Sequence, residues 1–217
     1  MIKIGSPKIM LGSPKLTKEG RMLDNVFSRT HDIFNNKMLR SVLLKLRYPI
    51  FLVAAVILIT QIDPSWFLPG LIVCLFGEFI QLWCFASLDK NKTLAVKGPY
   101  MLARNPMYIG RFFLLLGCLL LAGNIWVILV YIVLYYFYMV NRVKREEKKL
   151  RVVFGKAYGD YCEDVNRFVP SFKAIDWRSL WFFKWHLLLK NNGHWNLLAV
   201  LISFAVFYFF TFVYSTS

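Results

Sequence analysis

The chain alternates between long apolar runs and shorter segments rich in charge, a pattern typical of membrane-spanning helices. Five apolar runs are candidate spans, at residues 48–62, 66–88, 107–123, 125–140 and 195–214. A helix needs about 20 residues to cross a bilayer. The first run is therefore short, although Lys45 and Arg47 can snorkel and lengthen it toward Val42. We expect an all-α, multi-pass integral membrane bundle of about five transmembrane helices.

A further aromatic segment, residues 177–189, contains Arg178 and Lys184 and is interpreted as an interfacial helix. If it instead entered the bilayer and turned at residues 191–193, the topology of the carboxyl terminus would change. We expect three parts of the chain: a mobile cytosolic amino-terminal arm (1–41), a membrane core (42–173), and the interfacial helix with an additional transmembrane helix (174–217).

Composition and charge support a membrane location and indicate an orientation. Of 217 residues, 58% are hydrophobic, which is too apolar for a soluble fold, and the net charge is +15. Lipid headgroups explain this charge more simply than nucleic acid does. Ten basic residues precede Tyr48, five lie between Asp89 and Arg111, and twelve lie between Arg142 and Lys190. The amino terminus and alternate loops are therefore expected in the cytosol, at a bacterial inner membrane or an endoplasmic reticulum-type membrane.

Cysteine and histidine spacing gives no sign of a metal site. The sequence contains no Cys-x-x-Cys pair, and its three histidines are scattered. We therefore expect no structural zinc.

One polar segment with candidate chemistry lies between the second and third apolar runs. It reads KGPY at 97–100 and RNPMYIG at 104–110. The Gly-Pro pair predicts a turn, and Asn105 followed by Pro106 predicts an N-cap and a first-turn proline at the start of the third span. Free amides at that helix start would favour a carboxylate or phosphate. The alternative is plain helix capping.

A second polar segment continues the fourth apolar run and reads NRVKREEKKL at 141–150. Arg142 and Glu146 are four residues apart, so they share one helix face and are expected to pair. Gly155 is expected to end the helix, and Tyr158 and Tyr161 follow with helical spacing. The alternative is an ordinary solvated helix face.

Together these motifs resemble the isoprenylcysteine carboxyl methyltransferase family and its relatives, the phospholipid N-methyltransferases. The shared pattern is GPY, RxPxYxG, a helical hairpin, RxxxEExxL, FGxxYxxY and a closing RxxP, covering roughly residues 70–170. The resemblance implies an integral membrane methyltransferase that binds S-adenosylmethionine on the cytosolic side, within residues 97–170. It also implies a lipidic or small hydrophobic methyl acceptor. A soluble dinucleotide-type pocket is not expected, since no GxGxxG follows a strand pattern.

The resemblance assigns roles to individual residues. Arg142 is expected to face the reaction centre, where it would orient a carboxylate acceptor, and Glu146 is the nearest base for an amine or thiol acceptor. Either Glu146 or Glu147 would hold the amino group or ribose of the cofactor. The residues expected to bind the cofactor are Lys97, Gly98, Pro99, Tyr100, Arg104, Asn105, Pro106, Tyr108, Glu146, Glu147, Tyr158 and Tyr161.

Asn105 and Glu78 each allow two interpretations. The family usually has histidine where this chain has Asn105, and asparagine can hydrogen-bond a carboxylate but cannot carry a proton. That position therefore either binds cofactor only or indicates altered chemistry. Glu78, inside the second apolar run, is expected on the route of the acceptor because a charge within a span is a functional candidate. The alternative is a hydrogen bond to Gln81 or to a neighbouring helix.

Other functions remain open from the sequence. The acceptor could be a prenylated cysteine carboxylate, a phospholipid amine or a small thiol, and a non-catalytic membrane protein could retain the same fold. A transporter is disfavoured because few polar residues besides Glu78 and Gln81 occur in the apolar runs. A related nicotinamide-dependent reductase is disfavoured by the small number of spans and by the Glu-Glu segment.

Overall fold

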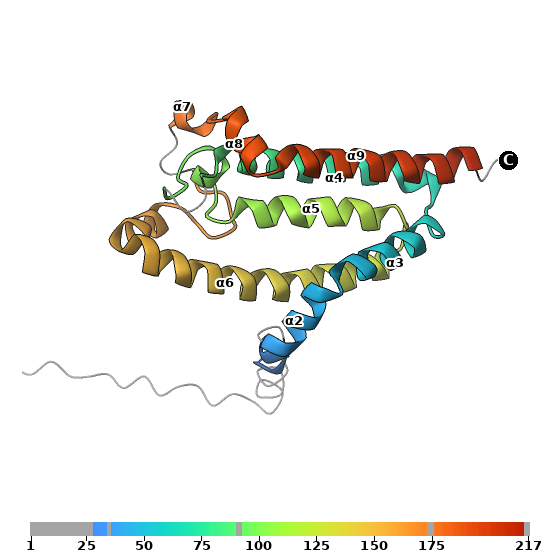
Figure 1. Ribbon diagram of the computed structural model, residues 1–217, viewed down its shortest axis with the longest axis horizontal. Coiled ribbons are helices and arrows are strands. Elements are labelled where there is room, and N and C mark those ends of the chain that lie inside the picture. The colour runs from blue at the N-terminus through green and yellow to red at the C-terminus, as the bar shows by residue number, and fades with distance from the viewer. Residues whose placement is uncertain (1–27, 34–35, 90–92, 173–175, 215–217) are drawn as a thin grey trace, which may run out of the picture.

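The computed structural model describes residues 28–33, 36–89, 93–172 and 176–214. These residues form helices and loops, and no strand occurs among them. Helices α4 (Pro64–Ser87), α5 (Pro106–Leu120), α6 (Ile125–Asp164) and α9 (Gly193–Tyr208) run along the long axis of the molecule (Figure 1). The π-helix η2 (Phe209–Val213) continues α9. The predicted all-α class is confirmed.

Each of the five predicted apolar runs corresponds to a helix. Within the described residues, three helical stretches are long and apolar enough to cross a membrane: α4, α6, and α9 continued by η2. Helices α3 (Arg47–Ile59) and α5 are apolar but shorter than a full span. Helix α2 (Lys37–Lys45) precedes α3, with Leu46 between them. Helix length by itself thus supports three of the five predicted spans.

The predicted amino-terminal arm falls largely outside the described residues, so its mobility stays a prediction. Its described part includes a short helical stretch at residues 28–33 and most of α2. Within the short stretch, His31 Nδ1 lies 3.0 Å from Oδ1 of Asn141 in α6. This contact places residues 28–33 beside the middle of α6.

One end of the bundle gathers the segments with candidate chemistry. The end of α4, the 3₁₀ turn η1 (Gly98–Met101), the start of α5 and the second half of α6 lie there, with the short helices α7 (Trp177–Leu180) and α8 (Trp185–Lys190) (Figure 1, left). We call it the basic end, because the Lys- and Arg-rich connections lie there. The described carboxyl-terminal residues lie at the other end. The expected interfacial helix over 177–189 is in fact two short helices separated by a non-helical stretch at 181–184.

Helices α4 and α5 pack backbone to backbone through glycines. A Cβ atom at Gly77 would lie 2.3 Å from the backbone nitrogen of Leu114 and 2.6 Å from the oxygen of Gly110. On α5, two helical turns after Gly110, a Cβ at Gly117 would lie 2.4 Å from the backbone nitrogen of Cys74 in α4. No side chain larger than hydrogen fits at these positions without moving a helix. Small residues permit such close approach between membrane helices.

Helix α6 changes direction at Gly155, which has φ 51° and ψ −123°. Glycine adopts positive φ without the steric penalty of a Cβ atom. The break predicted at this residue is confirmed, but helical structure resumes after it and continues to Asp164. The redirected segment carries Tyr158 and Tyr161, which line a cavity at the basic end.

The segment after residue 176 donates hydrogen bonds to backbone carbonyl groups at the end of α4. The backbone nitrogen of Lys184 donates to the oxygen of Ala86 at 3.1 Å. The side-chain amide of Asn191 donates to the oxygens of Phe85 and Leu88, at 2.9 and 2.6 Å. The last carbonyls of a helix lack partners within the helix. The carboxyl-terminal segment therefore stabilises the basic end of α4.

The glycine contacts predict that Gly77→Ala lowers stability, because the added methyl group would meet backbone atoms of α5 that cannot rotate away. We expect a loss of about 1–3 kcal/mol, as for overpacked cores, seen as a lower Tm of the detergent-solubilised protein. Gly159→Ala is the matched control, since a Cβ there has no atom within 4 Å. An unchanged Tm for Gly77→Ala would contradict the backbone contact.

Candidate functional site

A buried carboxylate organises the basic end. Glu147 of α6 is almost fully buried, and its Oε1 accepts hydrogen bonds from Arg104 Nε and Asn105 Nδ2, each at 3.2 Å. Its Oε2 accepts from Arg167, with Nη2 at 2.6 Å and Nε at 3.0 Å. Two guanidinium groups and an amide thus surround one carboxylate. Buried charges need such pairing to offset the cost of their desolvation.

These contacts join the loop before α5 to the chain after α6. Arg104 Nη1 donates to the backbone oxygens of Cys162 and Val165, at 2.9 and 3.2 Å, and the backbone nitrogen of Arg104 donates to Asn166. The backbone nitrogen of Ser171 donates to Leu102 at 2.7 Å. The Glu147 carboxylate also raises the pKa of Arg167, chiefly through their hydrogen bond. Arg167 therefore stays charged at any physiological pH.

Asn105 has a different role from the capping role predicted for it. It immediately precedes α5, as expected, but its side chain makes no capping hydrogen bond. The amide instead donates to Glu147, because φ −130° and ψ 53° turn the residue away from the helix axis. Within the described contacts, this position supplies a hydrogen-bond donor to a buried anion, and a protonated or neutral histidine has an N–H that can do the same.

A polar cavity of about 620 Å³ lies beside the Glu147 cluster. Its size is within the range of small-molecule and cofactor sites. The start of α5, the residues before η1, and both halves of α6 around the Gly155 break form its walls. Charged, amide and phenol groups line it together with apolar side chains: Leu88, Thr93, Leu94, Ala95, Tyr100, Arg104, Asn105, Met107, Tyr108, Glu146, Lys149, Leu150, Val153, Phe154, Tyr158 and Tyr161.

Glu146 lines this cavity and forms an ion pair with Arg142. Arg142 Nε lies 2.9 Å from Glu146 Oε1, which confirms the predicted pair, and 3.2 Å from the hydroxyl of Tyr108. Glu146 and Arg142 are each more than one third exposed, whereas Glu147 is buried. Adjacent glutamates thus differ in environment. Glu147 is fixed by cations, and Glu146 faces the cavity.

Tyrosines form part of the wall of the same cavity. The Tyr161 hydroxyl donates to the backbone oxygen of Tyr100 at 2.6 Å. Burial raises the pKa of Tyr100 well above its usual value, so its phenol stays neutral. The Tyr158 ring is buried, and its hydroxyl has no hydrogen-bond partner among the described residues. A buried hydroxyl without a partner is one that a ligand in the cavity can satisfy.

An apolar cavity of about 650 Å³ lies on the other side of the same loop. Neighbouring residues of the loop face different cavities: Pro99 and Ala103 line the apolar cavity, while Tyr100 and Arg104 line the polar one. The remaining lining residues come from α4, α5, α6 and the 168–170 segment: Phe76, Phe79, Ile80, Trp83, Leu102, Pro106, Ile109, Phe112, Phe113, Ile132, Tyr135, Tyr136, Met139, Phe168 and Pro170. The loop separates a polar space from an apolar one.

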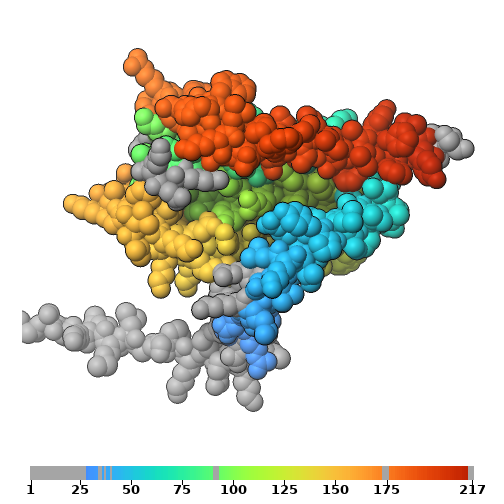
Figure 2. All heavy atoms as spheres, viewed as in Figure 1, coloured from blue at the N-terminus to red at the C-terminus, as the bar shows by residue number. Residues whose placement is uncertain are grey.

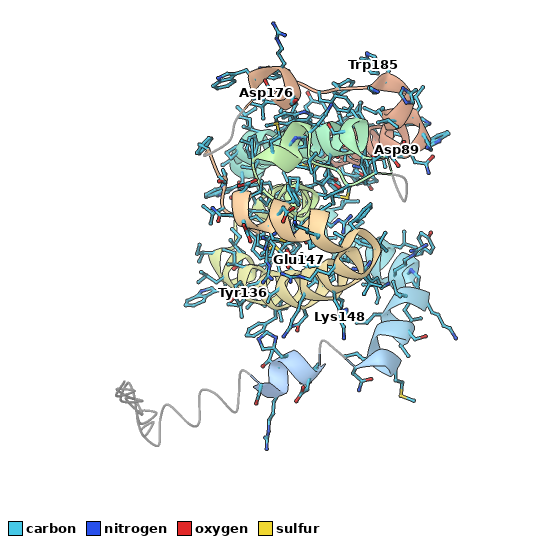
Figure 3. All side chains as sticks on the ribbon, turned by 90° about the vertical axis from the view of Figure 1, so that its left-hand side faces the viewer. Asp89, Tyr136, Glu147, Lys148, Asp176 and Trp185 are labelled. Carbon is cyan, nitrogen blue, oxygen red and sulfur yellow. The ribbon has the colours of Figure 1, made fainter. Side chains whose placement is uncertain are left out.

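Viewed along the helices from the basic end, Glu147 lies near the middle of the bundle and Lys148 on its lower side (Figure 3). In the space-filling view, the surface of α5 is visible between α6 and α9 (Figure 2). The cluster around Glu147 is therefore central, and the cavities beside it are built from helices that are neighbours in space.

The structure brings most of the predicted site residues together, with exceptions. Lys97 is exposed and lies over the ring of Phe182 instead of lining the polar cavity. Gly98, with φ 63°, packs against Ser87 and supports the turn. Pro99 and Pro106 line the apolar cavity. The predicted cofactor contacts of these four residues thus have no matching place in the polar cavity. Glu147 does not line it either, and Arg142, expected at the reaction centre, lines neither cavity.

Glu78 lies away from both cavities. Its carboxylate is buried in α4 and accepts a hydrogen bond from Asn196 Nδ2 of α9 at 2.6 Å. The lining of the polar and apolar cavities does not include it among the described residues. This geometry corresponds to the alternative stated above, a hydrogen bond to a neighbouring helix.

Sequence reasoning missed several residues of the site. Arg167 belongs to the closing RxxP motif, but its bidentate contact with Glu147 was not foreseen. Lys149 and Phe154 line the polar cavity, and they lie on the same α6 faces as Glu146 and Leu150. Helical spacing from Glu146 would have found Lys149. The contribution of Thr93–Ala95 had no sequence signal, because this loop reaches the cavity only through the fold.

Comparison with known proteins agrees with this arrangement. Residues 66–157 match the phospholipid methyltransferase family. The chain is 27% identical to protein-S-isoprenylcysteine O-methyltransferase of Xenopus laevis over 118 residues, covering 49% of this chain and 41% of that protein. The resemblance predicted from the motifs is confirmed. The Tribolium castaneum enzyme is 26% identical over 113 residues, covering 46% of this chain and 40% of the relative.

The extent of these matches is limited. The Rattus norvegicus enzyme is 26% identical over 118 residues, and this chain spans about 40% of the length of each of these methyltransferase relatives. No solved structure gives a significant match. The matched region contains most of α4, all of α5 and α6 up to its break, which form much of the two cavities, whereas the lining residues Tyr158, Tyr161, Phe168 and Pro170 lie beyond it.

The contact between Asn105 and Glu147 predicts opposite results for two substitutions. Asn105→His keeps an N–H donor, so we expect a Tm close to that of the parent protein. Asn105→Asp has almost the same shape but places a second carboxylate about 3.2 Å from Glu147. Unless a proton is taken up, like charges at this distance repel, so we expect a lower Tm that recovers partly as pH falls from 8 to 5. Equal Tm values for both variants would exclude the contact.

Proposed function

We propose that the protein is an S-adenosylmethionine-dependent membrane methyltransferase that acts on a lipidic acceptor. One observation carries this proposal: a single stretch of chain, residues 99–109, which comprises η1, the loop after it and the first turn of α5, lines both a polar cavity of cofactor size and an apolar cavity. A methyltransferase for lipids needs both spaces next to each other, since its cofactor is polar and its acceptor is not. The similarity to isoprenylcysteine O-methyltransferases supports the same reaction class.

The residues of the polar cavity fit the cofactor's chemical groups. S-adenosylmethionine supplies an electrophilic methyl carbon on a sulfonium centre. The carboxylate of Glu146 suits its ammonium group or ribose, and Arg104 and the start of α5 suit its carboxylate. Tyr100 and Tyr158 offer aromatic faces to the adenine ring or to the positive sulfonium. The cavity thus offers an anion for the cofactor's ammonium group and a cation for its carboxylate.

The apolar cavity suits the acceptor's hydrocarbon part. Its walls are almost entirely apolar, and they include side chains of α4, α5 and α6. A lipid tail could remain there at membrane level while its polar end reaches the loop. An isoprenylcysteine-type carboxylate is the acceptor we favour, since an ionised carboxylate needs no general base.

Within this proposal, the chain's residues act mainly by positioning. Methyl transfer is an in-line displacement, so orientation of the acceptor and exclusion of water lower the barrier most. Arg142 lines neither cavity but contacts Glu146 and the hydroxyl of Tyr108, so it would act by positioning these two groups in the wall of the polar cavity. Glu146 would accept the proton of an amine or thiol if such an acceptor is used. Water is kept out by the neutral phenols of Tyr100, Tyr158 and Tyr161.

Membrane topology completes the proposal. We infer that the basic end faces the cytosol, because loops rich in Lys and Arg remain on that side. The protein would then be multi-pass, with α3, α4, α5, α6 and α9 crossing or entering the bilayer. Cofactor would reach the polar cavity from the cytosol and lipid would reach the apolar cavity from the membrane.

Cofactor binding provides the direct test of the proposal. In calorimetric titration of the detergent-solubilised protein, we expect S-adenosylmethionine and S-adenosylhomocysteine both to bind. Glu146→Gln should weaken binding at least about tenfold with little change in Tm, because a charge-assisted hydrogen bond is lost. Glu163→Gln, an exposed carboxylate on the same helix, is the matched control. Absence of binding to folded parent protein would refute the proposed cofactor, and equal affinities in both variants would remove Glu146 from the site.

The apolar cavity leads to a separate kinetic prediction. Ile109→Trp would fill part of that cavity, so we expect a higher KM for a prenylated cysteine substrate and an unchanged affinity for S-adenosylhomocysteine. Val130→Trp, on an exposed face of α6 outside the cavity, should leave both values unchanged. A weaker cofactor affinity with an unchanged KM would show that the two cavities have been assigned the wrong way round.

A further inference from the structure

A third cavity lies mostly outside the region matched by the phospholipid methyltransferase family. It is an aromatic groove of about 350 Å³ between α4, the α7–α8 segment and the start of α9. Its lining residues are Phe79, Leu82, Trp83, Trp181, Phe183, Trp185, Leu188, Leu189, His194 and Leu197. Seven of these ten come from the carboxyl-terminal segment, which has no counterpart in the matched residues 66–157. The carboxyl-terminal segment therefore forms most of the groove, against Phe79 and Trp83 of α4, which also line the apolar cavity.

Aromatic side chains hold the groove in a defined shape. Trp83 of α4 stacks on Trp181, with ring centroids 6.0 Å apart and an interplanar angle of 20°. Phe183 packs edge to face against Trp185 at 5.0 Å. Tryptophan is favoured where hydrocarbon meets headgroups in a membrane. Trp185 lies in the outer layer of the molecule, on the side opposite Lys148 (Figure 3).

One polar side chain, His194, belongs to this otherwise apolar lining. Nδ1 of His194 is buried and makes no hydrogen bond within the described residues. A buried ring nitrogen without a partner is costly, and an oxygen-rich group of a ligand can satisfy it. A plain hydrocarbon ligand would leave His194 unsatisfied. The groove therefore suits an amphiphile.

Positive charge gathers around Phe182, which lies between two groove residues in the chain. The ammonium groups of Lys97 and Lys184 lie 5.4 and 5.1 Å from the ring centroid of Phe182, which is located between groove residues Trp181 and Phe183 in the chain. Arg178 is also nearby in sequence, and Asp176 caps α7 through the backbone nitrogens of Arg178 and Ser179. Lys190 is neutralised by Asp89 at 2.8 Å. Cations outnumber anions here, so an anionic headgroup is favoured.

We propose that this groove binds one anionic glycerophospholipid of the surrounding membrane. An acyl chain lies along the aromatic lining, an oxygen of the glycerol or ester region contacts His194, and the phosphate lies near Lys97 and Lys184. This proposal depends on the membrane location and not on methyl transfer. It also gives Lys97 a role that its position outside the polar cavity left unexplained.

Native mass spectrometry of the detergent-solubilised full chain tests the proposal, with phosphatidylglycerol and phosphatidylcholine as probes. We expect one phosphatidylglycerol to be retained in preference to phosphatidylcholine. The Lys97→Gln, Lys184→Gln double variant should bind phosphatidylglycerol about thirtyfold more weakly and phosphatidylcholine unchanged, because each lysine near a phosphate contributes on the order of 1 kcal/mol. Lys144→Gln, Lys148→Gln is the matched control, since both lysines are exposed on α6 at the same end.

A second variant tests the groove independently of charge. Leu197→Trp would fill the groove, and its Tm and S-adenosylhomocysteine affinity report whether the fold is intact. If this variant is folded, loss of the bound lipid supports the site, and retention overturns it. If it does not fold, the lysine variants decide. Equal binding of both lipids to the parent protein, equal loss in the control variant, or displacement of the lipid by millimolar inorganic phosphate would each overturn the proposal.

Discussion

The close packing of α4 against α5 determines where every other part of the site can lie. At Gly77 and Gly117 the two backbones approach so closely that even a methyl group has no space. With no water in a bilayer core, helices gain little from burying apolar area against each other and associate through such close contact. The register between α4 and α5 is thereby fixed. The start of α5, with Arg104 and Asn105 just before it, is held at a constant height relative to the end of α4.

The cluster around Glu147 uses that fixed position. Its carboxylate contacts two residues that precede α5 and one that follows α6, so it joins chain segments about 60 residues apart. Such a cluster adds specificity more than net stability, because desolvating Glu147 and Arg104 offsets much of the attraction between them. Its effect is to hold the loop between the polar and apolar cavities. Glu146, one residue earlier, takes no part in the Glu147 cluster and lines the polar cavity.

Much of this architecture could be predicted from the sequence, for identifiable reasons. Apolar runs located all five long helices, since periodicity and length are strong signals in a membrane protein. The pair Arg142–Glu146 and the break at Gly155 followed from local spacing and from glycine's conformational freedom. The spacing of the glycines at 70, 77, 110 and 117 also indicates close packing between two helices. Each pair is separated by seven residues, which places both members on one helix face.

What could not be predicted depends on contacts between distant segments. Asn105 has the sequence of an N-cap, yet its amide binds Glu147, because a buried charge outweighs one backbone donor exposed at a helix start. Lys97 adjoins the Gly-Pro turn in sequence but lies on the opposite side of it from the polar cavity. The aromatic segment at 177–189 lacks helical continuity because its middle forms hydrogen bonds to the end of α4.

The end of α4 connects the site to the carboxyl-terminal segment. Ser87 Oγ donates to the backbone oxygen of Phe182 at 2.9 Å, and a Cβ at Gly98 would lie 2.4 Å from the same Oγ. Gly98 begins the turn that holds Tyr100 in the wall of the polar cavity. The segment that forms the aromatic groove is therefore separated from that wall by one serine side chain. Because interfaces of this kind are close-packed, a ligand that fixes Phe182 also limits the movement of the turn.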